Sequence, residues 1–148
     1  ERGGENGQEP AHIRRFSVSS MHHQVLDFGN FSYARPCVSA TGCCHLFKRA
    51  ALERIGNFDL RFSPSQYDDL EHDIRQALEG NLVVYQGHLQ VRHMKRSGRA
   101  AWSDATQMMA SWANLFKLQT RYSQQQFDGI REREHQALLA DMLHRTEG

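Results

Sequence analysis

The stretch from Gln66 to Gly80, QYDDLEHDIRQALEG, gathers five acidic side chains in a pattern typical of a helix: Asp68, Asp69, Glu71, Asp73 and Glu79. Acids in the first turn of a helix complement its dipole by about 0.3–1 kcal/mol each, so a solvated acidic cap explains them without any chemistry. A carboxylate held rigidly at a helix N-terminus can instead act as a general base. The periodicity of this stretch leaves both interpretations open.

The helical periodicity predicts where these acids point. Successive residues advance by about 100°, which places four apolar residues on one narrow face that we expect to pack on a sheet: Tyr67, Leu70, Ile74 and Leu78. Asp69 then points nearly opposite this face, and Asp68 lies to one flank. Glu71 lies close to the buried edge, four residues before Arg75, which is the favourable order for an ion pair.

A second stretch with possible chemistry runs from Val84 to Gly98, VYQGHLQVRHMKRSG, where a basic loop follows a histidine. His93 at the end of a predicted strand is either a metal ligand or an ordinary surface histidine. Lys95, Arg96 and Arg99 form either a solvated turn or a clamp for phosphate groups. Residue types alone favour neither interpretation.

The elements that must position these residues follow from composition and turn signals. Residues 37–49 predict a buried strand that enters a helix, and residues 48–56 a short helix that ends at Gly56. Ser65 and Asp68 form a capping-box pattern for the acidic helix, which Gly80 ends. Two further strands are expected at 81–87 and 88–94.

The C-terminal third predicts helices. Apolar residues recur at three- and four-residue steps from about Ala100 to about Tyr122, which indicates an amphipathic helix. Trp102 and Trp112 are expected in the core rather than as platforms for a sugar. Asp128-Gly129 is expected to break the helix, and residues 130–145 to form the last one.

Composition limits the classes of function. A chain of 148 residues with a net charge of +1 does not favour nucleic-acid binding through bulk electrostatics. Three cysteines without CxxC, and nine histidines without HxxxH or HExxH, argue against a dedicated zinc site. Cys43 and Cys44 are expected as small buried strand residues, with reduced thiols. No apolar run is long enough to cross a bilayer, so the expected location is the cytoplasm, including the inner face of the membrane.

Residues 41–93 resemble the second half of the catalytic domain of family 2 glycosyltransferases. The resemblance lies in the order and spacing of short motifs: Thr41-Gly42, Lys48-Arg49, Ile55-Gly56-Asn57-Phe58-Asp59, Phe62, Tyr67-Asp68-Asp69, Glu71, Arg75, Gly80 and His93. It implies an α/β fold that forms the C-terminal, acceptor-side part of a GT-A fold. A short mixed sheet with flanking helices and a helical C-terminal extension is therefore expected.

The resemblance also implies roles for individual residues. Asp69 aligns with the acid that takes the proton from the acceptor hydroxyl in inverting members. Asp68 stands where the family usually has Glu, and with Gly42 and Tyr67 it is expected to contact substrate. Glu71 stands where the family more often has Asp, and it is expected to support the site together with Arg75.

The resemblance places the donor's diphosphate near the basic loop. His93 aligns with a histidine that in some members coordinates the divalent metal, Mn²⁺ or Mg²⁺, on that diphosphate. Lys95 and Arg96 are expected to pair with the phosphates. The implied partners are a nucleotide-sugar donor and a glycan or another hydroxyl acceptor.

The expected organisation is a flexible polar segment at 1–15, an acceptor-side glycosyltransferase part at 16–99 and a helical extension at 100–148, through which the chain could form a homo-oligomer. The sequence contains no Asp-x-Asp motif, which the family uses to hold the metal. We therefore expect a fragment of an enzyme whose donor-binding half lies elsewhere and which is inactive alone. A non-catalytic carbohydrate- or protein-binding half-domain is the alternative, and a histidine-based metal-binding protein is a further one.

Overall fold

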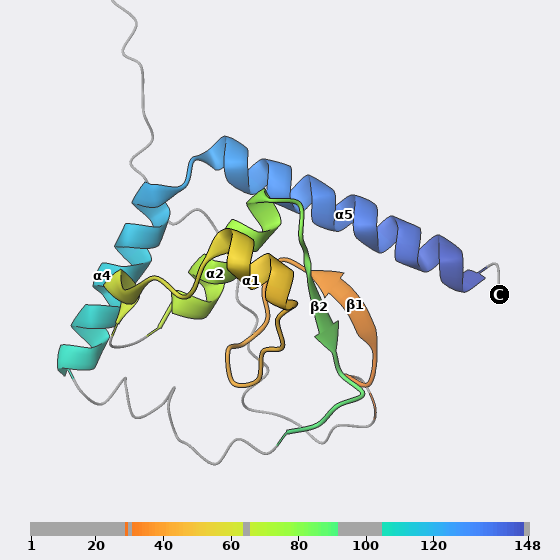
Figure 1. The fold of residues 1–148 in the computed structure, drawn as a ribbon, viewed down its shortest axis with the longest axis horizontal. Coiled ribbons are helices and arrows are strands. Elements are labelled where there is room, and N and C mark those ends of the chain that lie inside the picture. The colour runs from red at the N-terminus through yellow and green to blue at the C-terminus, as the bar shows by residue number, and fades with distance from the viewer. Residues whose placement is uncertain (1–28, 30, 64–65, 92–104, 147–148) are drawn as a thin grey trace, which may run out of the picture.

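A computed structural model describes residues 29, 31–63, 66–91 and 105–146 (Figure 1). The described residues form four α-helices, a 3-10 helix and two strands, and so belong to the α/β class. In chain order these are β1 (Ala34–Cys37), α1 (Arg49–Ile55), η1 (Leu60–Phe62), α2 (Asp68–Leu78), β2 (Val83–Gln86), α4 (Ala105–Arg121) and α5 (Gln124–Thr146).

The two strands form one antiparallel sheet, with Ala34 opposite Gln86 and Cys37 opposite Val83. The expected mixed sheet is therefore not present in the described part of the chain. Gly87 donates its backbone N–H to the Tyr33 carbonyl at 2.8 Å and extends the pairing. A Cβ at Gly87 would lie 1.7 Å from the Phe31 carbonyl oxygen, so this position requires glycine.

Two of the predicted strands differ from those observed. The strand predicted at 37–49 is observed earlier, as β1, and residues 38–48 form a loop without helix or strand. The reason is that backbone N–H groups of this loop find carboxylate acceptors on α2 instead of a neighbouring strand. Cys43 and Cys44 lie in the loop and are exposed, so their expected burial is wrong. Residues 88–91, predicted as strand, form no strand, because the chain turns at Gly87 and His88, where the Leu89 N–H donates to the Gln86 carbonyl.

Helices α1 and α2 confirm the sequence prediction. Gly56 ends α1 at φ 87° and donates its N–H to the Leu52 carbonyl at 2.8 Å. The strained backbone there suits glycine, which has no Cβ. The start of α2 differs from the prediction, since Tyr67 precedes its first residue and no side chain caps it. Ser65, the predicted cap, lies outside the described residues.

Helices α4 and α5 are separated at Ser123 rather than at Asp128-Gly129, which lies inside α5. Ser123 accepts from the Gln126 N–H through its hydroxyl at 3.2 Å, and the Gln126 amide oxygen accepts from the Ser123 N–H at 2.8 Å. This reciprocal capping box starts a new helix at Gln124, four residues before the Asp-Gly pair, which explains the wrong prediction. None of the helices in the described ranges is long and apolar enough to span a bilayer.

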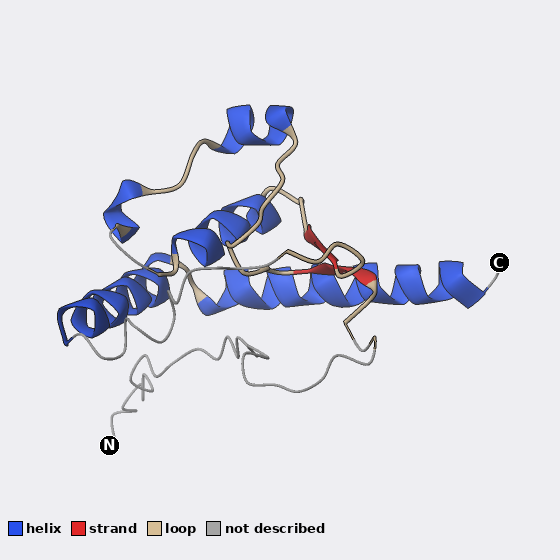
Figure 2. Ribbon diagram, turned by 90° about the horizontal axis from the view of Figure 1, so that it is seen from below, coloured by secondary structure: helices blue, strands red, loops and turns tan. Residues whose placement is uncertain are grey.

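Helix α2 lies at the centre of the described fold, and α5 runs past the two strands (Figure 2). The Val38 N–H donates to the Glu134 carboxylate of α5 at 3.1 Å. The apolar core joins residues of η1, α2, α4 and α5 to the loop after β1: Val38, Phe62, Leu70, Ile74, Ala77, Leu118, Tyr122, Phe127 and Ile130. Trp112 is 56% exposed, so its predicted place in the core is wrong. Trp102 lies outside the described residues.

Candidate functional site

Two carboxylates of α2 hold the loop that follows β1. Asp69 Oδ2 accepts the backbone N–H of Gly42 at 2.9 Å. One helical turn later, Asp73 Oδ2 accepts the Ser39 hydroxyl at 2.8 Å and the Ala40 N–H at 3.2 Å. The loop is therefore fixed along one side of the helix by its own polar backbone groups.

Asp69, predicted to point nearly opposite the apolar face of α2, is partly exposed and lies against this loop. The predicted apolar face is buried or partly buried, but burial also covers a second side of α2. The polar residues buried on the helix are Glu71, His72, Asp73 and Gln76. The prediction of one narrow packed face fails because the loop and the C-terminal helices enclose the helix from several directions.

Gly42 allows the close approach of the loop to Asp69. A Cβ added at Gly42 would lie 2.9 Å from both Cβ and Oδ2 of Asp69, which is closer than real side chains come. The Leu70 N–H donates to Asp69 Oδ1 at 2.8 Å. Each carboxylate oxygen therefore has one backbone donor, which fixes the orientation of a group that is still partly exposed.

Asp73 lies behind Asp69 on the same helix and is almost fully buried. Burial raises the pKa of the Asp73 carboxyl, the Ser39 hydroxyl opposes this shift, and the negative charge of Asp69 adds to it. His45, for which the sequence indicates no role, places Nε2 3.0 Å from the Ala40 carbonyl, so this nitrogen carries the proton that it donates. Asp73 and His45 thus anchor the loop on which Gly42 lies.

Glu71 is completely buried and accepts from donors on α2 and at the C-terminal end of α4. Arg75 Nε lies 3.0 Å from each Glu71 oxygen, which confirms the predicted ion pair. The Tyr122 hydroxyl donates to Oε1 at 2.7 Å, and Arg121 Nη1 lies 3.1 Å from the same oxygen. Burial and the bond to Glu71 raise the pKa of the Tyr122 hydroxyl, which therefore remains a donor.

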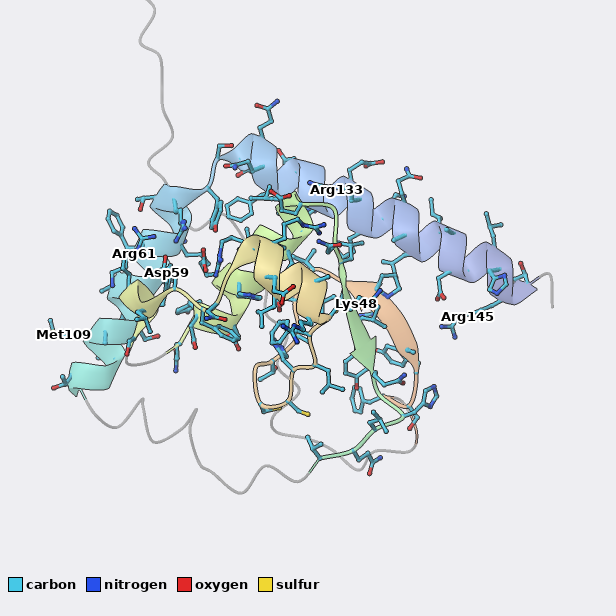
Figure 3. All side chains as sticks on the ribbon, in the orientation of Figure 1. Lys48, Asp59, Arg61, Met109, Arg133 and Arg145 are labelled. Atoms are coloured by element: carbon cyan, nitrogen blue, oxygen red, sulfur yellow. The ribbon has the colours of Figure 1, made fainter. Side chains whose placement is uncertain are left out.

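The same network holds the segment between α1 and η1. Arg75 donates to the carbonyls of Ile55 at 2.9 Å and Asn57 at 2.7 Å. Arg121 of α4 donates to Asp59 Oδ2 at 2.6 Å (Figure 3 shows Asp59 and Arg61 beside α4). The Arg61 guanidinium holds the pKa of the Asp59 carboxyl well below its usual range. Helix α2 is therefore braced on the side away from the Gly42 loop.

The turn before α2 has a strained backbone. Gln66 and Tyr67 have φ of 67° and 70°, a region that residues with a Cβ rarely adopt. Helix α4 holds this turn, because Asn114 Nδ2 donates to the carbonyls of Phe62 at 2.6 Å and Gln66 at 3.2 Å. Strain of this kind persists where surrounding contacts over-determine it, and it clusters at functional sites. It places Tyr67 against the core and leaves Asp68 partly exposed in the first turn.

His72 is a buried residue that apolar periodicity does not indicate. Its ring stacks on Phe58 with centroids 4.8 Å apart and meets the edge of Phe47 at 5.0 Å. Its Nε2 lies 3.0 Å from the Gly56 carbonyl and donates to it. His72 thus ties the end of α1 to α2, and the aromatic residues Phe47 and Phe58 near the IGNFD motif are the sequence signal for this contact.

The predicted donor-side residues His93, Lys95, Arg96 and Arg99 lie outside the described residues, so their metal and phosphate roles stay predictions. Within the described ranges, no group of three His, Cys, Asp or Glu side chains could hold a metal ion. Of the predicted site residues, the structure brings together Gly42 and Asp69 on one side of α2, and Glu71 and Arg75 on another.

No family model, curated protein or solved structure matches the chain.

Proposed function

We propose that this chain is the acceptor-side part of an inverting, metal-assisted glycosyltransferase of family 2, in which Asp69 is the catalytic base. The proposal rests on the resemblance of residues 41–93 to that family. Gly42, Tyr67 and Asp68 would contact substrate, and Glu71 with Arg75 would hold α2 in place.

The observation that carries the proposal is the contact between Gly42 and Asp69. These residues belong to two motifs of the resemblance that are 27 residues apart in sequence, and their atoms lie 2.9 Å apart. If these short motifs matched the family by chance, two of them would not be expected to lie in contact. The strained turn at Gln66 and Tyr67, directly before Asp68 and Asp69, is a second feature typical of functional sites.

In the proposed reaction, Asp69 accepts one proton. The acceptor oxygen attacks the anomeric carbon of the donor, the bond from that carbon to the nucleotide diphosphate breaks, and the hydroxyl proton passes to the Asp69 carboxylate. A base must come within about 2.6–3.2 Å of the oxygen it deprotonates. The backbone donors at Gly42 and Leu70 fix the carboxylate in one orientation, and its partial exposure leaves room for the acceptor.

The donor side of the proposal depends on residues outside the described ranges. His93 would be a ligand of Mn²⁺ or Mg²⁺ at the donor diphosphate, with Lys95 and Arg96 pairing with the phosphate oxygens. When bound, such a cation neutralises the charge that develops on the leaving diphosphate.

A second candidate function is a non-catalytic carbohydrate- or protein-binding half-domain. It is favoured by the fact that both Asp69 oxygens already accept backbone N–H groups, as an acid that only anchors a loop would do. This function predicts saturable binding of a glycan or protein that does not depend on metal or on the charge of Asp69.

The experiment that tests the proposal measures release of nucleoside diphosphate by the intact protein that contains this chain. Uridine, guanosine and thymidine diphosphate sugars are supplied in turn, with Mn²⁺ and a set of glycan and alcohol acceptors. We expect acceptor-dependent release with one donor, and none with the 148-residue chain alone. Glycan binding without any release would favour the second function.

A further inference from the structure

Two exposed cysteines are neighbours at the tip of the loop between β1 and α1 (Figure 1). The hydrogen bond from His45 Nε2 to the Ala40 carbonyl, at 3.0 Å, closes the base of this tip. Residues 41–44 lie inside the closure and are all exposed, and Cys43 and Cys44 are the last two of them. Cysteine is among the residue types most often buried, and its reactivity rather than its packing usually explains why it is kept. The position of the Cys43–Cys44 pair is therefore best explained by thiol chemistry.

The third cysteine lies in a different environment. Cys37 is partly buried in β1, and burial raises the pKa of its thiol. A thiol that stays protonated is a weak nucleophile, because the thiolate is the form that reacts. Reaction with a dissolved disulfide is therefore expected at Cys43 and Cys44 rather than at Cys37, which serves as an internal control.

Metal binding does not explain the Cys43–Cys44 pair. No group of three His, Cys, Asp or Glu side chains in the described ranges could hold a metal ion. Two thiolates alone are only part of the ligand set of a structural zinc site. The chemistry that needs no further ligand is formation of a disulfide between the two neighbouring residues.

A disulfide between neighbouring residues requires a change in the backbone. Their Cα atoms lie about 3.8 Å apart across a trans peptide bond, whereas disulfides usually join Cα atoms about 4.4–6.8 Å apart. The backbone around Cys43 and Cys44 must therefore rearrange when the bond closes. Gly42 directly precedes the pair, and its N–H donates to Asp69 Oδ2 at 2.9 Å. This contact has no spare room, since a Cβ at Gly42 would lie 2.9 Å from Asp69.

We propose that Cys43 and Cys44 are a reversible redox site, and that their oxidation to a disulfide releases the Gly42 N–H from Asp69. Disulfides that are strained or exposed are readily reduced, so the bond opens again when a thiol is in excess. The proposal does not depend on the glycosyltransferase activity proposed above, because it concerns the loop and not the reaction.

The oxidant is a small disulfide such as glutathione disulfide. One cysteine thiolate attacks a sulfur of this disulfide, forms a mixed disulfide with it and releases one glutathione thiolate. The neighbouring thiolate then attacks the mixed disulfide at the protein sulfur, closes the bond between Cys43 and Cys44 and releases the second glutathione. Two electrons pass from the pair to glutathione disulfide, and the two glutathione thiolates take up the two protons that the protein thiols lose.

The test treats the 148-residue chain carrying Cys37→Ser with excess glutathione disulfide and measures the mass of the product. We expect a monomer that has lost two hydrogen atoms, carries no glutathione and regains both thiols with dithiothreitol. Cys44→Ser in the same background is the matched variant. It has no second thiol to displace glutathione from Cys43, so it should keep one glutathione per chain. The chain with Cys37 intact should give the same disulfide, with Cys37 still open to alkylation after unfolding.

Amide hydrogen exchange measures the effect of oxidation on the loop. The Gly42 amide should exchange about three- to tenfold faster in the oxidised chain than in the reduced chain, the factor expected for the loss of one hydrogen bond. The Val38 amide is the control, because it donates to Glu134 at 3.1 Å and lies outside the closed tip. Its exchange should not change.

Four results would overturn the proposal. Failure of the reduced chain to react would show that the exposed thiols are inert. Two glutathiones on one chain would show that the thiols react independently of each other. A disulfide that includes Cys37, or one that joins two chains, would contradict the pairing of Cys43 with Cys44. Unchanged exchange of the Gly42 amide after oxidation would contradict its release from Asp69.

Discussion

The backbone amide of Gly42 lies 2.9 Å from Oδ2 of Asp69, and the space where a Gly42 side chain would begin is filled by Asp69 itself. The loop after β1 and the first turn of α2 are therefore fitted to each other at one point. This contact fixes the carboxylate that we propose as the base, and it makes the glycine as necessary to the site as the acid.

Replacing Gly42 with alanine should disrupt this contact. The added Cβ would meet Asp69 Cβ and Oδ2 at 2.9 Å, and the shift that relieves this clash should lower the free energy of unfolding by about 1–3 kcal/mol. Gly129→Ala is the matched control, because no atom lies within 4 Å of the new Cβ inside α5. It should instead stabilise the chain by about 0.5–1 kcal/mol. Urea unfolding measures both, and destabilisation by Gly129→Ala as large as that by Gly42→Ala would contradict the contact.

Removing Glu71 should lower the free energy of unfolding far more than removing an exposed acid that forms an ion pair at the same i,i+4 spacing. Glu71→Ala leaves Arg75 and the Tyr122 hydroxyl without their buried acceptor, so we expect a loss of about 3–5 kcal/mol in the free energy of unfolding. Glu53→Ala breaks the Arg49–Glu53 pair, which has the same i,i+4 spacing but is exposed at both ends, and should cost at most about 1 kcal/mol. Equal losses for the two variants in urea unfolding would show that the buried network does not hold α2.

The stability of the chain should depend on pH through Asp73. Burial raises the folded-state pKa of this carboxyl above its unfolded value of about 3.9, so its contribution to stability is fully present below that value. The contribution is lost as the pH rises through the folded-state pKa. Asp73→Asn keeps an oxygen acceptor for Ser39 but cannot ionise.

The unfolding free energy of the wild type should therefore fall relative to that of Asp73→Asn from about pH 4 upward, and the difference should then level off. Urea unfolding at several pH values measures this difference. Parallel curves for the two proteins would mean that burial does not shift the pKa of Asp73.

Local signals were sufficient to predict the helices around the site. Gly56 and Gly80 mark the ends of α1 and α2, both observed at positive φ, and the i,i+4 spacing of Glu71 and Arg75 predicts their ion pair. The contact between Asp69 and Gly42 could not be predicted, because it depends on a loop that folds back onto α2 from 27 residues away. Periodicity describes a helix with one packed face, whereas α2 is enclosed on several sides.

The C-terminal helices show a different limit of prediction. Apolar residues at helical spacing predict a packed face, but α4 has two apolar sides, and among the described residues only one of them is covered. The sequence alone does not say which side faces the core. Asn114 decides it, because its amide binds the carbonyls of Phe62 and Gln66, and no apolar pattern indicates such a polar anchor.

The central claim, that Asp69 is a catalytic base, is tested most directly by Asp69→Asn in the intact protein. Donor binding and acceptor-dependent release of nucleoside diphosphate are measured side by side, with Glu79→Gln at the other end of α2 as the control. General bases contribute about 10²–10⁴-fold, so turnover should fall by at least about 100-fold while the donor affinity stays nearly unchanged and Glu79→Gln keeps full activity. An Asp69→Asn enzyme with undiminished turnover would contradict the assignment and leave Asp69 as an anchor of the Gly42 loop.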